Sequence, residues 1–279
     1  MCTTCGCGSD ETRVTVLDHE NPHGHDHPHP HDQPHGHDQP HGHDHPHGHD
    51  HPHAAGPTHD HPADDRTHTL ELEVAVLAKN DELAAANRAW LSEHGITAVN
   101  LMSSPGSGKT TLLERTIATV GRSVSVIEGD QETLFDAERI RRAGARAVQV
   151  NTGAGCHLDA SMVARALSQL HPEDGSLLFI ENVGNLVCPA LFDLGERRKV
   201  VVISVTEGDD KPLKYPHMFA AADLVVVNKT DLLPYVDFDT ERLTADARKI
   251  NPEVLVLPVS AKTGDGLDTW LDWLIQVRP

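Results

Sequence analysis

Aromatic side chains are scarce, at 4% of the 279 residues, so the core must be built from aliphatic residues. No apolar run approaches the ~20 residues needed to cross a bilayer. No basic region followed by an apolar stretch, the pattern of a secretory signal, opens the sequence. Basic residues are also few: 23 lysines and arginines stand against 42 aspartates and glutamates, which gives a net charge of -19. We therefore expect a cytoplasmic protein that binds neither nucleic acid nor membrane.

Cysteine is rare, and three of the five cysteines lie within the first eight residues. Cytosolic thiols stay reduced, so this cluster indicates metal binding rather than disulfides. Cys2, Cys5 and Cys7 supply three sulfurs, and removal of Met1 would add the α-amine of Cys2 as a fourth ligand. Such a set fits square-planar Ni²⁺ or tetrahedral Zn²⁺. The alternative is an incidental, redox-sensitive cysteine tail.

Residues 9–67 have almost nothing to bury. They hold most of the chain's 22 histidines, together with proline, glycine and aspartate, in repeats such as Pro34–Asp38 and Pro40–Asp44. Without apolar contacts the segment cannot offset its ordering entropy, so we expect disorder. Imidazole binds Ni²⁺, Zn²⁺, Cu²⁺ and Co²⁺ with little selectivity. The tract is therefore either a metal buffer or a solvated tail that binds metal incidentally.

Residues 68–279 have an ordinary globular composition, and we expect one domain there after the 1–8 motif and the 9–67 tract. Leu70 to Glu93 carries apolar residues at helical spacing: Leu72, Val76, Leu83, Ala86 and Trp90. Apolar runs then alternate with helical stretches, at 98–102, 124–128, 147–150, 177–181, 200–205, 224–228 and 254–258. A closing helix spans Gly266 to Val277. This order predicts a three-layer α/β fold of the P-loop type, with a mostly parallel sheet covered by helices on both faces.

A glycine-rich segment follows the first apolar run of this domain and indicates a phosphate-binding loop. Lys109 would reach the β- and γ-phosphates, and the Thr110 hydroxyl would hold Mg²⁺. The pattern asks for glycine six positions before the lysine, where this chain has Ser103. A chance turn is the alternative for so short a motif. The residues assigned to this loop are Gly106, Ser107, Gly108, Lys109, Thr110 and Thr111.

A second nucleotide motif, Asn228-Lys229-Thr230-Asp231, lies at the end of a buried strand, where open α/β sheets place ligand contacts. The Asp231 carboxylate can accept from both N1–H and the exocyclic amine of guanine, whereas adenine would leave it unpaired. Asn228 would tie this loop to the P-loop, and Lys229 would lie along the base. Taken alone, the motif could be a polar loop. After the next strand, Ser260-Ala261-Lys262 resembles the second guanine loop of GTPases.

Two acidic residues at strand ends are candidates for the Mg²⁺ environment. Glu181 precedes Asn182-Val183-Gly184, although most GTPases have aspartate at this position, and Asp130 follows Glu128-Gly129. Asp136 is equally well explained as a helix-cap acid. With Lys109, these residues predict hydrolysis of GTP to GDP and phosphate, by positioning and charge neutralisation.

Three further metal ligands lie within the globular part. Cys156 and His157 precede an expected helix, and Cys188 follows the strand that ends at Glu181. Separately they would be a buried cysteine and a surface histidine. Because both segments lie just beyond the carboxyl ends of strands, they can meet near the nucleotide. Together they would give one chain three ligands.

The chain resembles the HypB family of nickel-insertion GTPases of hydrogenase maturation. The segments that carry the resemblance are SSPGSGKTTLLE, EGDQETLFDAERI, NTGAGCHLDA, LLFIENVGNLVCPALFDLGE, SVTEGDDKPLKYPHMF and NKTDLLP, together with CTTCGCG at the amino terminus. It implies a GTP-dependent homodimer in which Cys156, His157 and Cys188 bind Ni²⁺ or Zn²⁺ at the interface. It also implies a HypA-like nickel chaperone and a [NiFe]-hydrogenase large-subunit precursor as partners, and Lys211 as a contact to the phosphate across the dimer.

Two alternatives remain at this stage. The related urease nickel chaperones carry Cys-Pro-His at the internal site, whereas here Cys188-Pro189 is followed by Ala190. The other alternative is a nickel-storage protein, which the long histidine tract favours.

Overall fold

The computed structural model describes residues 13–16, 64–130, 135–153 and 155–277. The chain divides into two units, residues 1–17 with 71–279 and residues 18–70, and the start of α1 is the described part of the second. The strands are β1 (Arg13–Val16), β2 (Thr97–Ser103), β3 (Val124–Asp130), β4 (Arg146–Asn151), β5 (Leu177–Gly184), β6 (Arg198–Ser204), β7 (Leu224–Asn228) and β8 (Leu255–Pro258). The helices are α1 (Asp64–Glu93), α2 (Lys109–Thr119), α3 (Phe135–Arg142), α4 (Ala160–Leu170), α5 (Lys211–Lys214), α6 (Pro216–Ala220), α7 (Thr240–Ile250) and α8 (Leu267–Gln276), with 3₁₀ turns η1 (Cys188–Leu191) and η2 (Thr230–Tyr235).

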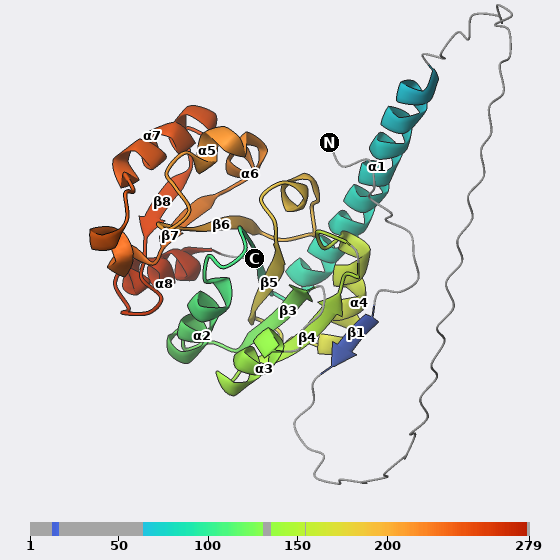
Figure 1. The fold of residues 1–279 in the computed structure, drawn as a ribbon. Helices are drawn as coiled ribbons and strands as arrows, with labels where there is room; N and C mark the ends of the chain where they lie inside the picture. Colours follow the sequence, from blue (N-terminus) through green and yellow to red (C-terminus); the bar gives the residue numbers. More distant parts are fainter. Residues whose placement is uncertain (1–12, 17–63, 131–134, 154, 278–279) are drawn as a thin grey trace, which may run out of the picture. The chain divides into compact units, whose positions relative to one another are not determined.

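The strands form one eight-stranded sheet in the order β1-β4-β3-β5-β2-β6-β7-β8. Every neighbouring pair is parallel except β1 with β4. β2 lies inside the sheet, with β3, β4 and β5 on one side of it and β6, β7 and β8 on the other. Ligands are expected beyond the carboxyl end of a strand at which the strand order switches sides in this way. Helix α2, which is labelled in Figure 1, begins six residues after the end of β2. The predicted mostly parallel α/β fold of the P-loop type is confirmed.

Side chains alternate between the two faces of the sheet, as the period of two requires. Val99 and Leu101 of β2 pack with α2, α3 and α8, around the buried ring of Trp270. Ala98 packs on the opposite face with Leu91 of α1 and with α4. On that second face, β6 and β7 pack against α6 and α7. Helices therefore cover both faces, which gives the predicted three layers.

Strand β1 lies within the tract that the sequence predicts to be disordered. Arg13 is opposite Asn151 and Val16 is opposite Val148, in an antiparallel ladder on the edge of the sheet. Arg-Val-Thr-Val has the β-branched residues of a strand, and Val14 packs against the core. The expectation of a tract without structure therefore does not hold for these four residues, nor for residues 64–67, where α1 begins.

Helix α1 is present as predicted, but its buried stripe is different. Val76 is 41% exposed and Ala86 is exposed. Among the α1 side chains from residue 74 onward, those that are buried are Asn80, Ala84, Asn87 and Leu91. Trp90 packs against the core as the apolar pattern predicts, but the pattern does not find the two polar residues among these four. In the described parts of the chain, no helix is both long enough and apolar enough to cross a membrane.

Candidate nucleotide and metal sites

The predicted phosphate loop connects β2 to α2. Lys109 and Thr110 begin α2 and are buried, and Lys109 Nζ donates to Ser103 Oγ at 2.6 Å. The serine in place of the expected glycine thus accepts a hydrogen bond from the lysine. Gly108 has φ 96°, and a Cβ there would lie 2.5 Å from Asn228 Nδ2. Only glycine fits this position without displacing Asn228.

Asn228 joins the phosphate loop to both predicted guanine loops. Its Nδ2 donates to Ser107 O at 2.8 Å, and its Oδ1 accepts from Ala261 N at 3.1 Å. The side chain is buried, so all of these contacts are shielded from water. Lys229, with φ 62°, donates from Nζ to Gly106 O at 2.6 Å. The structure therefore brings together motifs that lie more than 100 residues apart in the sequence.

The remaining guanine-loop residues lie beside these. Asp231 Oδ1 accepts from Ser260 Oγ at 2.7 Å, and this hydrogen bond holds the carboxylate against the second guanine loop. The carbonyl oxygen of Lys262 accepts from Arg115 Nη2 at 2.9 Å. Arg115 thus ties the second guanine loop to α2, the helix that begins in the phosphate loop.

Two buried carboxylates lie at the carboxyl ends of neighbouring strands. Thr110 Oγ1 donates to Glu181 Oε1 at 2.9 Å, so these two predicted neighbours of Mg²⁺ are in contact. Glu128 of β3 is in register with Glu181 of β5, and both are almost fully buried. Burial, followed by the charge of Glu181, raises the pKa of Glu128 to about 9. Burial also raises the pKa of Glu181, although Lys109 opposes this shift.

The sequence did not identify Glu128 as a site residue, because an acidic residue within an apolar strand carries no motif of its own. Its Oε2 and that of Glu181 have no hydrogen-bond partner among the described residues. Buried unpaired oxygens beside Thr110 and Lys109 fit a divalent cation, since carboxylate and hydroxyl oxygens are the ligands that Mg²⁺ prefers. Asp130, the other predicted acid, is the half-buried last residue of β3.

Thr111 and Asp136 meet at one arginine. Arg139 Nη2 donates to Thr111 Oγ1 at 3.2 Å, and Arg139 Nη1 pairs with Asp136 at 3.1 Å. Arg139 also pairs with Glu114 at 2.7 Å. Asp136 therefore lies in the first turn of α3 with an ion-pair partner on the same helix.

The three internal metal-ligand candidates converge. The ligand atoms of Cys156, His157 and Cys188 all lie within 4.8 Å of one another. The two Sγ atoms are 2.8 Å apart, and Cys156 Sγ is 3.6 Å from His157 Nδ1. Burial lowers the pKa of His157, so its imidazole is neutral at pH 7, the form that binds metal. The His157 ring stacks on Phe192 at 3.9 Å between centroids.

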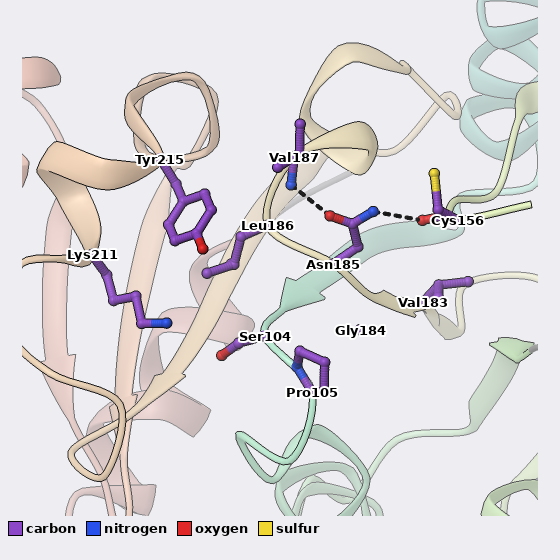
Figure 2. Close-up of a pocket in the computed structure, with 10 residues that line it drawn as sticks. All are labelled: Ser104, Pro105, Cys156, Val183, Gly184, Asn185, Leu186, Val187, Lys211 and Tyr215. Carbon is purple, nitrogen blue, oxygen red and sulfur yellow. Dashed lines mark hydrogen bonds between the residues drawn. The ribbon is translucent and has the colours of Figure 1, made fainter. Parts of the chain in front are cut away.

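A cavity of about 390 Å³ lies between the phosphate loop and this triad. Figure 2 shows Ser104 and Pro105 on one side of it, Cys156 on another, and Lys211 approaching from α5. Lys211 Nζ lies 3.6 Å from Glu207, and Ser104 Oγ donates to the same carboxylate. Glu207 was not found from the sequence, because an acid after a strand carries no motif of its own.

The predicted amino-terminal ligands Cys2, Cys5 and Cys7 lie outside the described residues, as does most of the histidine tract.

Comparison with known proteins places this geometry in a family. Residues 97–258 match the model for the CobW/HypB/UreG nucleotide-binding domain. The chain is 52% identical to hydrogenase maturation factor HypB of Azotobacter vinelandii, over 100% of this chain and 93% of the relative. It is 49% identical to HypB of Escherichia coli K12, over 98% of both chains.

Solved structures agree. A crystal structure of HypB from Helicobacter pylori in complex with nickel aligns with a TM-score of 0.68 at 41% identity, covering 71% of this chain and 94% of that one. HypB from Archaeoglobus fulgidus aligns with a TM-score of 0.67 at 47% identity, covering 71% and 98%. The chain belongs to the CobW/HypB/UreG family and, within it, to the HypB hydrogenase maturation factors.

Proposed function

We propose that this protein hydrolyses GTP to GDP and phosphate, and that it uses the nucleotide cycle to deliver nickel to a [NiFe]-hydrogenase large-subunit precursor. The observation that carries the proposal is the shared cavity, which has phosphate-loop residues Ser104 and Pro105 in one wall and Cys156 in another. A nucleotide site and a thiolate site that share a wall can influence each other's affinity, and by linkage the influence is reciprocal.

The residues of the phosphate loop supply the hydrolytic part. Lys109 and the loop amides would neutralise the transferred phosphoryl group, and bound Mg²⁺ would add a further positive charge there. Thr110 and Glu181 would hold the Mg²⁺, and Asp130 would orient water from the end of β3. Asp231 would select guanine by accepting from two donors of the base. The Ser260 hydroxyl keeps the carboxylate in place for that role.

The triad supplies the nickel-binding part, and Ni²⁺ is its cargo. Two thiolates and one imidazole leave a fourth position for water or for a ligand from a second copy, and Zn²⁺ is the competing ion. Val187 and Leu191 flank Cys188 and are each 54% exposed. A second copy of the chain would cover these apolar side chains, which supports a homodimer. Its dependence on GTP would follow from the cavity that this segment shares with the phosphate loop.

The link between the two sites is short. A Cβ on Gly184 would lie 3.1 Å from the Pro105 Cα, so β5 touches the phosphate loop there. The next residue, Asn185, donates from Nδ2 to Cys156 O at 3.4 Å and accepts from Val187 N at 2.8 Å (Figure 2). A shift of the phosphate loop upon hydrolysis would thus reach both segments that carry the thiols.

In this proposal, Cys2, Cys5 and Cys7 form a second nickel site, the histidine tract buffers the metal, and a HypA-like protein is the partner in transfer. The reduced thiols that this chemistry needs favour the cytoplasm.

The test compares Lys109→Ala and Cys188→Ser with a control variant on α7, Lys249→Ala, whose side chain is 70% exposed. We expect Lys109→Ala to abolish GTP hydrolysis and GTP-dependent nickel release while nickel still binds. Cys188→Ser should still bind GTP. In a chain that also carries Cys2→Ala, Cys5→Ala and Cys7→Ala, it should lose the thiolate absorption of nickel at the internal site. Hydrolysis at the wild-type rate in Lys109→Ala would contradict the enzymatic assignment.

A nickel-storage role is the second candidate, and the histidine-rich composition favours it. Deletion of residues 17–63, which leaves β1 and α1 intact, separates the two. For a delivery enzyme, hydrogenase activity in a producing host should survive at ample nickel and fall when nickel is scarce. Unchanged nickel release in Lys109→Ala, with hydrogenase activity limited only by stored metal, would instead support storage.

A further inference from the structure

Two buried asparagines on α1 face the metal triad's supporting segments. Asn80 and Asn87 are only 6% and 5% exposed. Seven residues is two helical turns, so the two side chains leave the same face of the helix. A buried amide is costly unless its hydrogen bonds are satisfied, so each of these side chains must have specific partners.

Asn80 bonds to two segments that are far apart in the sequence. Its Oδ1 accepts from Ala160 N at 2.9 Å, and its Nδ2 donates to Asp193 O at 2.8 Å. Ala160 is the first residue of α4, and Asp193 follows η1 and Phe192. One side chain therefore connects the start of α4 to the segment after η1.

Asn87 makes a second connection between the same segments. Its Nδ2 donates to Ala160 O at 2.9 Å and to Leu194 O at 3.0 Å. Close approach of the helix requires Gly195, because a Cβ there would lie 2.7 Å from the Asn87 Cβ. Arg88 adds an ion pair to Asp193 at 2.6 Å.

These two segments are the ones that carry the metal ligands. Cys156 and His157 end three residues before Ala160, and Cys188 opens the turn that ends just before Phe192. The stacked rings of His157 and Phe192 join the segments from within. The asparagines join them from the α1 side, so the separation of the Cys188 thiol from the other two ligands depends on both amides.

We propose that Asn80 and Asn87 are positioning residues for the metal triad, and that their paired hydrogen bonds hold the two ligand-bearing segments at the separation that the bound metal requires. This rests on the proposed metal function of Cys156, His157 and Cys188. Neither asparagine touches the metal; each acts by fixing the backbone that presents the ligands.

The experiment uses the full chain with Cys2→Ala, Cys5→Ala and Cys7→Ala. Of the five cysteines, only Cys156 and Cys188 then remain, and histidines give no sulfur-to-nickel charge-transfer band. The band therefore reports the triad alone, even though the histidine tract also binds Ni²⁺. A chelator fixes the free Ni²⁺ concentration. In this background Asn87→Ala should weaken the metal affinity of the triad by about 10- to 100-fold, the range found when outer partners of metal ligands are removed, and shift the band.

Leu91→Ala is the matched control, because Leu91 is 3% exposed on the same helix and shares a core cluster with Leu158 and Leu194, but its side chain makes no hydrogen bond to either segment. It should lower the thermal midpoint while leaving the band and the nickel affinity within twofold. Guanine-nucleotide affinity, measured with a fluorescent GDP, shows that each variant is folded. Asn80→Ala, which removes one bond to each segment, provides the same test if Asn87→Ala does not fold.

The outcomes separate the two claims. Nickel affinity and band unchanged in the asparagine variants, or weakened equally in Leu91→Ala, would overturn the positioning role. If Cys188→Ser also leaves the band unchanged, the proposed triad itself is wrong. Loss of the band in Cys188→Ser, together with weakening in Asn80→Ala and Asn87→Ala alone, supports both.

Discussion

Glu128 and Glu181 are directly opposite each other on β3 and β5, and both carboxylates are buried where the strands meet the phosphate loop. Each has one oxygen without a hydrogen-bond partner among the described residues. Two negative charges this close in a low-dielectric setting are unfavourable unless a proton or a cation is shared. A proton on Glu128 or a cation bound between the two carboxylates would relieve this repulsion.

The first prediction concerns the pH dependence of stability without nucleotide or Mg²⁺. The pKa of Glu128 is about 9 in the fold, above its ordinary value of 4.5, so the folded protein binds the extra proton. Its contribution to stability is complete below pH 4.5 and is lost as pH rises toward 9. The thermal midpoint should decrease as the pH is raised from 6 to 8.5, and this decrease should be smaller in Glu128→Gln. Identical pH profiles for both proteins would contradict the shared-proton interpretation.

The second prediction concerns base selection. Asp231→Asn removes the charged acceptor and places an amide donor opposite the guanine donors, so GTP affinity should fall about 10- to 100-fold. Xanthine has a carbonyl in place of the exocyclic amine, and its nucleotides should bind the variant better than GTP. Competition with fluorescent GDP measures both, and the exposed Asp237→Asn serves as the control. Unchanged discrimination would remove Asp231 from the base site.

The third prediction concerns the fit of α1. Gly195→Ala combines a positive φ of 92° with contacts of 2.7 Å to Ala84 O and to the Asn87 Cβ. Gly144→Ala has a comparable φ of 104° but meets nothing within 4 Å. Conformational strain alone costs about 1–2 kcal/mol. Gly195→Ala should therefore lower the free energy of unfolding by clearly more than Gly144→Ala does, in urea titrations of both. An equal decrease in the free energy of unfolding for the two variants would show that α1 can shift away from residue 195 at little cost.

The fourth prediction concerns oxidation of the metal-free triad. The Cys156 and Cys188 sulfurs are 2.8 Å apart, so a thiol oxidant such as diamide, which takes up two electrons and two protons, should join them in a disulfide. Added Ni²⁺ should slow this reaction by occupying both thiolates. Mass mapping of the Cys156 and Cys188 peptides measures the cross-link. A rate that does not respond to Ni²⁺ would argue against shared coordination.

The nucleotide motifs could be predicted because they are local. The seven predicted strand segments appear in the fold with boundaries shifted by a few residues at most, since buried parallel strands are continuous apolar runs. The positions of Lys109, Asn228 and Asp231 follow from a loop that must lie at a strand end. That Cys156 and Cys188 meet could only be suggested, because their contact depends on how β4 and β5 are ordered in the sheet.

Other features left no trace in the sequence. Asn80 and Asn87 look like solvated positions of an amphipathic helix, and their burial depends on carbonyl and amide groups from two distant loops. Glu128 is hidden in an apolar run, and its importance comes from the register with Glu181. Strand β1 is obscured by the polar composition around it, and only the open edge of β4 shows why four residues order there.

The antiparallel pairing of β1 also limits where the first cysteines can go. Cys7 precedes Arg13 by six residues, which span no more than about 20 Å when fully extended. Arg13 is opposite Asn151, and Cys156 follows Asn151 by five residues. The start of β1 therefore lies beside the end of β4 from which the internal thiol loop departs. Any transfer of metal between a thiol joined to Arg13 and that loop of the same chain would have an effective concentration set by the length of the linker and independent of protein concentration.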